Sequence, residues 1–162
     1  MNLNKSYAAI LRTLLLLAAF FSLGVKAEPQ INTLTNSSLF ARHTGVAILG
    51  YDTVAYFTEG KPVKGNDSYV TDWKGAKWKF SSQKNLDLFK ADPEKYAPQY
   101  GGYCAYGVSQ GYLVKVEADQ FSVRDGKLYL NYDADVQKTW SKQPDNYIKT
   151  ANAKFNQLIG KH

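Results

Sequence analysis

Residues 96–111 read YAPQYGGYCAYGVSQG, and the rest of the chain is expected to be organised around this stretch. It holds Cys104, the only cysteine, shortly after the pair Gly101 and Gly102. Glycine accepts positive φ angles and lets another group approach the backbone closely, so the pair predicts a tight, shaped loop. Core packing is the favoured role of the surrounding rings, with a pocket for a small aromatic or cationic ligand as the alternative. These pocket candidates are Tyr100, Tyr103 and Tyr106, joined by Trp78 and Tyr129.

The first 27 residues have the three parts of a secretory signal peptide. Lys5 and Arg12 precede the apolar run TLLLLAAFFSLGV, and Ala27 ends a cleavage tripeptide before Glu28. The run is too short to span a bilayer, and no twin arginine precedes it, which favours a Sec-type route. We therefore expect a periplasmic protein with no transmembrane segment after signal removal. It would consist of a lead-in segment at residues 28–45 and one domain at residues 46–162.

Composition narrows the classes of function. The formal net charge is +6 and the cations form no cluster, so nucleic acid is not an expected partner of this exported chain. A single cysteine cannot form an internal disulfide, so stability must come from packing of the many aromatic rings. The chain has no Cys-x-x-Cys motif, which excludes a self-contained dithiol oxidoreductase.

The chain beyond residue 46 alternates short helical and extended patterns. Strands are expected at residues 68–73, 77–80, 112–116, 121–123 and 127–130. The last two flank Asp125 and Gly126, a strong hairpin-turn signal. Helices are expected after the capping or opening residues Asp52, Ser81 or Ser82, Asp92, Asp133 or Asp135, and Pro144. This order predicts a small single-domain α+β fold with short antiparallel hairpins and packed helices.

Three pieces of the chain carry a family resemblance: GYDTVAYFTEGKPVKG, WKFSSQKNLDLFKADPEKYAPQYGGYCAYGVSQGYLVKV and DGKLYLNYDADVQKTW. Together they resemble the exported YHS domain-containing proteins of bacteria, over residues 46–157. The chain is also distantly similar to the short metal-binding YHS module of copper-transport ATPases and some monooxygenases. That module has cysteines where this chain has Ser81 and Asn85, and a third where it has Val54 and Ala55. The resemblance thus implies a YHS-like fold without the module's thiolate ligands.

Cys104 has two open interpretations. It is either an inert thiol packed among tyrosines, or a thiol in a shaped loop that ligates a soft metal such as Cu(I) or exchanges with a thiol-bearing protein. His43 would complete a two-ligand Cys–His site if the lead-in segment folded back towards the loop. Cys104 of a second chain in a dimer, or an exogenous ligand, could also supply the second metal ligand. The remaining imidazole, His162, is expected at a frayed end.

Two other patterns are interpreted as structural. Residues 107–111, GVSQG, spell a serine-nucleophile motif, but that motif needs a preceding strand, a following helix and a later histidine. A strand is expected to follow here, so a glycine-bounded turn is predicted. The acids Asp52, Asp72, Asp133 and Asp135 form no hard-cation loop and are expected to cap helices or turns.

The sequence thus predicts a periplasmic YHS-type binding protein, with soft-metal or thiol-linked binding through Cys104. A binding module is favoured over an enzyme. The alternatives are a thiol-dependent redox enzyme that needs an external resolving thiol, and a scaffold domain without site chemistry. The identity of the metal ion or thiol-bearing partner and the oligomeric state stay open.

Overall fold

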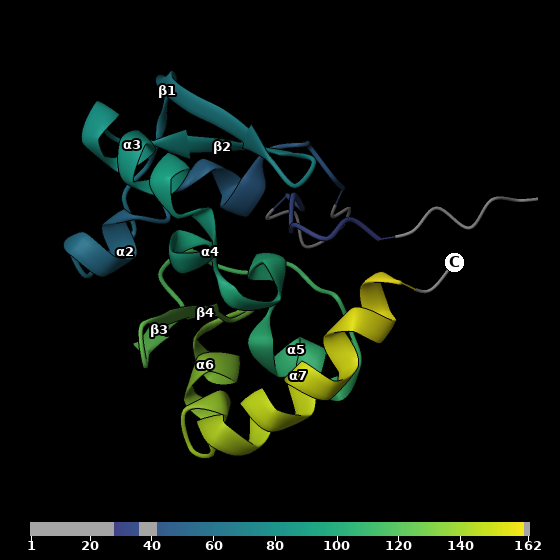
Figure 1. The fold of residues 1–162 in the computed structure, drawn as a ribbon. Helices are drawn as coiled ribbons and strands as arrows, with labels where there is room; N and C mark the ends of the chain where they lie inside the picture. The colour runs from purple at the N-terminus through teal and green to yellow at the C-terminus, as the bar shows by residue number, and fades with distance from the viewer. Residues whose placement is uncertain (1–27, 36–41, 161–162) are drawn as a thin grey trace, which may run out of the picture.

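The computed structural model describes residues 28–35 and 42–160 of the chain (Figure 1). The predicted signal peptide at residues 1–27 and His162 lie outside the described residues. Within the described part, no helix is long and apolar enough to cross a membrane. The elements in chain order are η2 (Ala47–Gly50), α2 (Ala55–Thr58), β1 (Asn66–Trp73), β2 (Ala76–Phe80), α3 (Gln83–Ala91), α4 (Pro93–Tyr96), η3 (Gln99–Gly102), α5 (Ala105–Gln110), β3 (Phe121–Arg124), β4 (Lys127–Leu130), α6 (Ala134–Trp140) and α7 (Pro144–Ile159).

Two antiparallel hairpins organise these elements, and the predicted single α+β domain is confirmed. β1 pairs with β2, and β3 pairs with β4. Figure 1 shows the first hairpin with α2 and α3 in the upper part of the molecule, and the second with α5, α6 and α7 in the lower part. The turn of the first hairpin has Lys74 and Gly75 at positive φ. The turn of the second has Asp125 and Gly126 at positive φ, as the sequence predicts.

The core is built from aromatic rings, as the composition predicts. Trp78 and Phe80 lie on the buried face of β2, and both pack against Phe89 of α3. A second cluster joins Tyr129 of β4 to Trp140 of α6, with ring centroids 5.5 Å apart. Trp78 and Tyr129 are therefore core residues.

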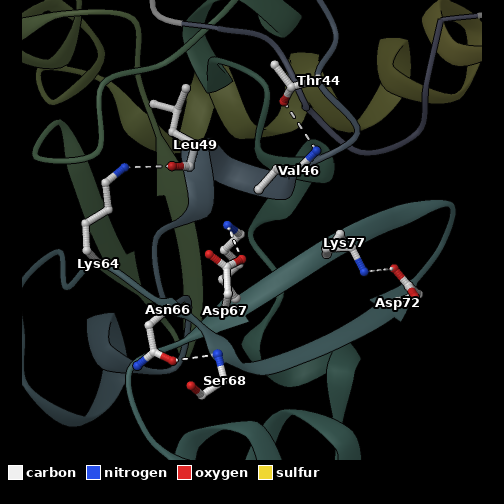
Figure 2. A network of polar contacts seen from close by, with 10 residues as sticks. Thr44, Val46, Leu49, Lys64, Asn66, Asp67, Ser68, Asp72 and Lys77 are labelled. Carbon is white, nitrogen blue, oxygen red and sulfur yellow. Dashed lines mark hydrogen bonds and ion pairs between the residues drawn. The ribbon is translucent and has the colours of Figure 1, made fainter.

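Helix ends follow the predicted capping chemistry. Ser82 accepts a hydrogen bond from the Asn85 backbone, and Asp133 accepts one from the Val136 backbone. Pro144 stands at the start of α7, where its missing N–H costs nothing. Local polar contacts lie around η2 and the β1–β2 hairpin, including the bond that Lys64 Nζ donates to the Leu49 carbonyl of η2 at 2.7 Å (Figure 2).

Two local predictions were wrong. Residues 112–116 form no strand; their backbone runs irregularly beside Cys104, whose N–H donates to the Val114 carbonyl at 3.3 Å. Residues 107–111 are not a turn but the second half of α5, which Gly111 ends at φ 96°. Gly107 tolerates this helical position because its missing Cβ leaves room for Val114. Residues 112–116 therefore pack closely against α5 instead of pairing with another strand.

The described part of the lead-in segment packs on the domain. Ile31, Asn32 and Thr33 are buried. Asn32 donates its backbone N–H to the Gly101 carbonyl at 2.8 Å and its side-chain amide to the Gly102 carbonyl at 2.9 Å. These contacts connect the lead-in segment directly to the glycine loop that the sequence singled out.

Candidate functional site

Cys104 is buried, with 1% of its surface exposed. It stands at the start of α5, where its Sγ accepts a hydrogen bond from the Gly107 N–H at 3.3 Å. The same sulfur donates to Asn131 Oδ1 at 3.6 Å. Burial raises the pKa of the thiol and outweighs the hydrogen bonds that lower it. Because the thiolate is the reactive and metal-binding form, this environment favours the packing interpretation of Cys104.

His43 is held within the lead-in segment. Its Nδ1 lies 2.8 Å from Thr33 Oγ1, and its Nε2 lies 3.3 Å from Glu28 Oε2. The segment does fold back onto the glycine loop, but both imidazole nitrogens contact residues of the segment itself. Across residues 28–35 and 42–160, no three His, Cys, Asp or Glu side chains gather in a way that could hold a metal ion.

The glycine loop forms η3 and is as tightly shaped as the sequence predicts. Gly101 and Gly102 have φ angles of 60° and 81°. A Cβ on Gly101 would collide with the Gln30 carbonyl, and one on Gly102 would collide with the Ile48 side chain. The loop is therefore shaped to receive the lead-in segment rather than to expose Cys104.

A cleft of about 370 Å³ opens beside this loop, between the lead-in segment, the β1–β2 turn, α4, η3 and α7. We call it the Tyr100 cleft. Its walls carry aromatic rings, carboxamides and one acid–base pair. The rings are Trp73, Tyr100 and Phe155, the carboxamides are Gln30, Gln99, Asn152 and Asn156, and the charged residues are Lys74 and Glu94.

Tyr100 is one of two cleft residues, with Lys74, that adopt a positive φ without being glycine. Its φ of 57° and ψ of 33° place a bulky, non-glycine residue in the left-handed region. Its hydroxyl donates to Asn152 Oδ1 at 2.9 Å, with the Ile148 carbonyl at 3.3 Å. Burial, with a smaller effect of Tyr129, raises the pKa of this hydroxyl, so it stays a donor at neutral pH. Because the Asn152 oxygen is engaged, its amide hydrogens remain for other partners.

The charges of the cleft neutralise each other. Lys74 Nζ lies 2.6 Å from Glu94 Oε1 and 4.4 Å from the centroid of the Trp73 ring. The lysine therefore has both an anionic partner and an aromatic one. The remaining polar lining is uncharged.

The other predicted pocket residues lie elsewhere. Tyr103 is fully buried and donates its hydroxyl to the Pro29 carbonyl at 2.9 Å. Tyr106 packs its ring against Tyr147, with centroids 5.1 Å apart. Of the loop candidates, Tyr100 and Gly101 line the cleft. The sequence did not predict the amides of α7 as part of this site. The Tyr100–Asn152 hydrogen bond joins residues 52 positions apart, and no local pattern indicates that α7 faces η3.

A second polar cluster surrounds Asp52, which is fully buried. Its Oδ1 accepts from the backbone N–H groups of Val54 at 2.9 Å and Ala55 at 3.3 Å. Its Oδ2 accepts from Ser81 N at 2.8 Å, Ser81 Oγ at 2.6 Å and Asn85 Nδ2 at 2.7 Å. Asp52 thus caps α2 as predicted, and it also ties α2 to the start of α3, which the sequence did not indicate.

Residues 54–100 match the family model described as YHS domain, a region that runs from the start of α2 to the middle of η3. No curated protein and no solved structure matches the chain.

Proposed function

We propose that this chain, which contains a YHS domain at residues 54–100, acts as a binding module for a small, polar organic molecule held in the Tyr100 cleft. The observation that carries the proposal is Tyr100 itself. A left-handed non-glycine residue costs on the order of 1–3 kcal/mol and persists where surrounding contacts demand it, and such residues cluster at active sites, ligand clamps and switch regions. The cleft volume, about 370 Å³, lies in the range of small-molecule sites.

The cleft residues support binding rather than catalysis. Its titratable side chains are Lys74, Glu94 and Tyr100. The first two are paired with each other at 2.6 Å, and the raised pKa of Tyr100 keeps its proton in place. A general base needs a free acceptor, and these groups are engaged with each other or with Asn152.

A metal of the kind bound by the short YHS module does not fit the residues present. At the module's ligand positions, Ser81 and Asn85 both donate hydrogen bonds to Asp52. Val54 and Ala55 have aliphatic side chains that ligate nothing. Soft metals are held by thiolates, and these positions carry none. The carboxylate of Asp52 organises this region instead.

The copper and thiol roles of Cys104 stay predictions. Either role requires the buried sulfur to become accessible. Equilibrium titration with Cu(I) against a competing chelator tests the first: binding of up to one equivalent per chain that Cys104→Ala abolishes would support it. Equal binding by the variant would leave Cys104 as packing.

Export to the periplasm is likewise a proposal, supported by the signal-peptide pattern of residues 1–27. The mature chain should begin at or near Glu28. Intact-mass measurement of a periplasmic extract tests this, and a mass that still includes residue 1 or 2 would overturn it.

The cleft itself can be tested by amide-shift NMR with a mixture of neutral sugars, amino-acid amides and sugar phosphates. At least one member should shift the amides of Lys74, Gly101 and Asn152 together. Tyr100→Phe removes the hydroxyl that orients Asn152 and should weaken this binding, whereas Tyr106→Phe, outside the cleft, should not. Shifts that never involve these amides would overturn the proposal.

A further inference from the structure

The lining of the Tyr100 cleft points to one chemical class of ligand. Resting on the proposed function, we infer that the cleft binds an uncharged carbohydrate of one or two sugar units. Three properties of the lining carry this inference: its balanced charge, its carboxamides and its half-buried aromatic rings.

The charge balance selects against ions. Lys74 and Glu94 satisfy each other at 2.6 Å, and the lysine also sits over the Trp73 ring. The pair is neutral as a whole and partly exposed, so it offers neither an anion nor a cation a net electrostatic attraction. A neutral ligand leaves the pair intact.

The carboxamides match hydroxyl groups. A carboxamide offers both donors and an acceptor, and a sugar hydroxyl also donates and accepts, so the two can pair in either direction. Asn152 is already oriented by Tyr100, with its oxygen engaged at 2.9 Å. Among the contacts between described residues, the side chains of Gln99 and Asn156 make no hydrogen bond, which leaves both for a ligand.

Phe155 and Trp73 are half-buried and supply apolar ring surface in fixed positions, with Lys74 Nζ over one face of Trp73. Trp73 is held edge-to-face by Trp78 and Phe89, with centroids 5.5 Å and 5.7 Å away. Phe155 is held edge-to-face by Tyr100 at 5.7 Å. The C–H groups on one face of a sugar ring pack well on such a surface while its hydroxyls point outward to polar partners. Because the rings are already ordered, binding loses little of their freedom.

The experiment titrates the full mature chain with neutral sugars at millimolar concentrations, followed by amide-shift NMR and Trp fluorescence. The probes are glucose, galactose, N-acetylglucosamine, maltose and cellobiose. Glucose 6-phosphate, glucuronate and glucosamine serve as charged counterparts, and alanine amide represents a neutral non-sugar. We expect at least one neutral sugar to bind at the cleft and its charged counterparts to bind at least threefold more weakly.

Variants of α7 residues localise the binding. Asn156→Ala removes one carboxamide and should weaken sugar binding about three- to tenfold, as expected for one hydrogen bond. Phe155→Ala should weaken it at least as much. Gln157→Ala changes the exposed neighbouring residue outside the cleft lining and should leave the affinity unchanged.

The outcomes separate the ligand class from the cleft. Tighter binding of a charged sugar or of alanine amide at the cleft would overturn the carbohydrate assignment and leave the proposed binding module standing. Sugar binding that Asn156→Ala and Phe155→Ala both leave unchanged would overturn the assignment to this site. Absence of cleft shifts with every probe, including the sugar phosphates and amides, would overturn both proposals.

Discussion

The side-chain amide of Asn85 donates a 2.7 Å hydrogen bond to the buried carboxylate of Asp52, from which it is separated by 33 positions in the chain. Ser81 donates to the same oxygen through its backbone and its hydroxyl. Both carboxylate oxygens of Asp52 therefore accept hydrogen bonds. A neutral amide at this position would have one accepting oxygen and could not satisfy all of these donors.

Asp52→Asn should destabilise the fold strongly although it barely changes side-chain size. In either amide orientation, the new NH₂ group faces backbone or side-chain donors that now lose their acceptor. Because these donors are buried and would lose a charged partner, we expect the free energy of unfolding to fall by at least about 3 kcal/mol. Urea denaturation measures it.

The matched control is Asp67→Asn. Asp67 pairs with Lys79 at 2.6 Å but is 85% exposed at its side chain (Figure 2). Exposed ion pairs contribute about 0–1 kcal/mol, so this variant should unfold almost like the original chain. If the two variants lose similar stability, the buried hydrogen bonds of Asp52 contribute no more to stability than an exposed ion pair does.

Gly101→Ala should detach the lead-in segment from the domain. The new Cβ would meet the Gln30 carbonyl, and the φ of 60° is unfavourable for alanine. Gly60→Ala is the control, because Gly60 has a similar φ of 67° but open space around it. The control should cost about 1–2 kcal/mol from conformation alone. Gly101→Ala should cost more and should also expose the lead-in segment to proteolysis, and equal losses would argue against the close approach.

Cys104 should react slowly with alkylating reagents in the folded protein. Its thiol is buried and its pKa is raised above the usual 9.0, so little thiolate exists at neutral pH. Reaction should become fast once the chain is unfolded in denaturant. The test compares alkylation rates across pH in native and denatured samples. Rapid native reaction near neutral pH would revive the redox interpretation.

Alkaline pH should weaken the fold. Burial is the main cause that raises the pKa of Tyr100 and of Tyr103 above the usual 10.0. The unfolded chain ionises these phenols first, so their contribution is complete below pH 10 and is lost as pH rises through the folded pKa. Denaturation at about pH 8 and about pH 11 measures the loss. Tyr103→Phe should reduce this pH dependence, whereas Tyr112→Phe, at a position 66% exposed, should leave it unchanged.

Local patterns in the sequence determined most of the secondary structure. The alternation of Trp78 and Phe80 placed both rings inside, and the Asp125–Gly126 turn produced the β3–β4 hairpin. Caps at Ser82 and Asp133 also formed as predicted. These features depend on residues a few positions apart, so a linear pattern contains them. The family resemblance was confirmed over residues 54–100.

Only the tertiary structure decided the sites. Cys104 and His43 were predicted from residue type alone, and the fold buries the first and engages the second with Thr33 and Glu28. The Tyr100 cleft joins segments from the lead-in to α7, and the Asp52 cluster joins α2 to α3. Such contacts arise where distant segments pack together, and the side-chain pattern of any one segment does not encode its distant partner.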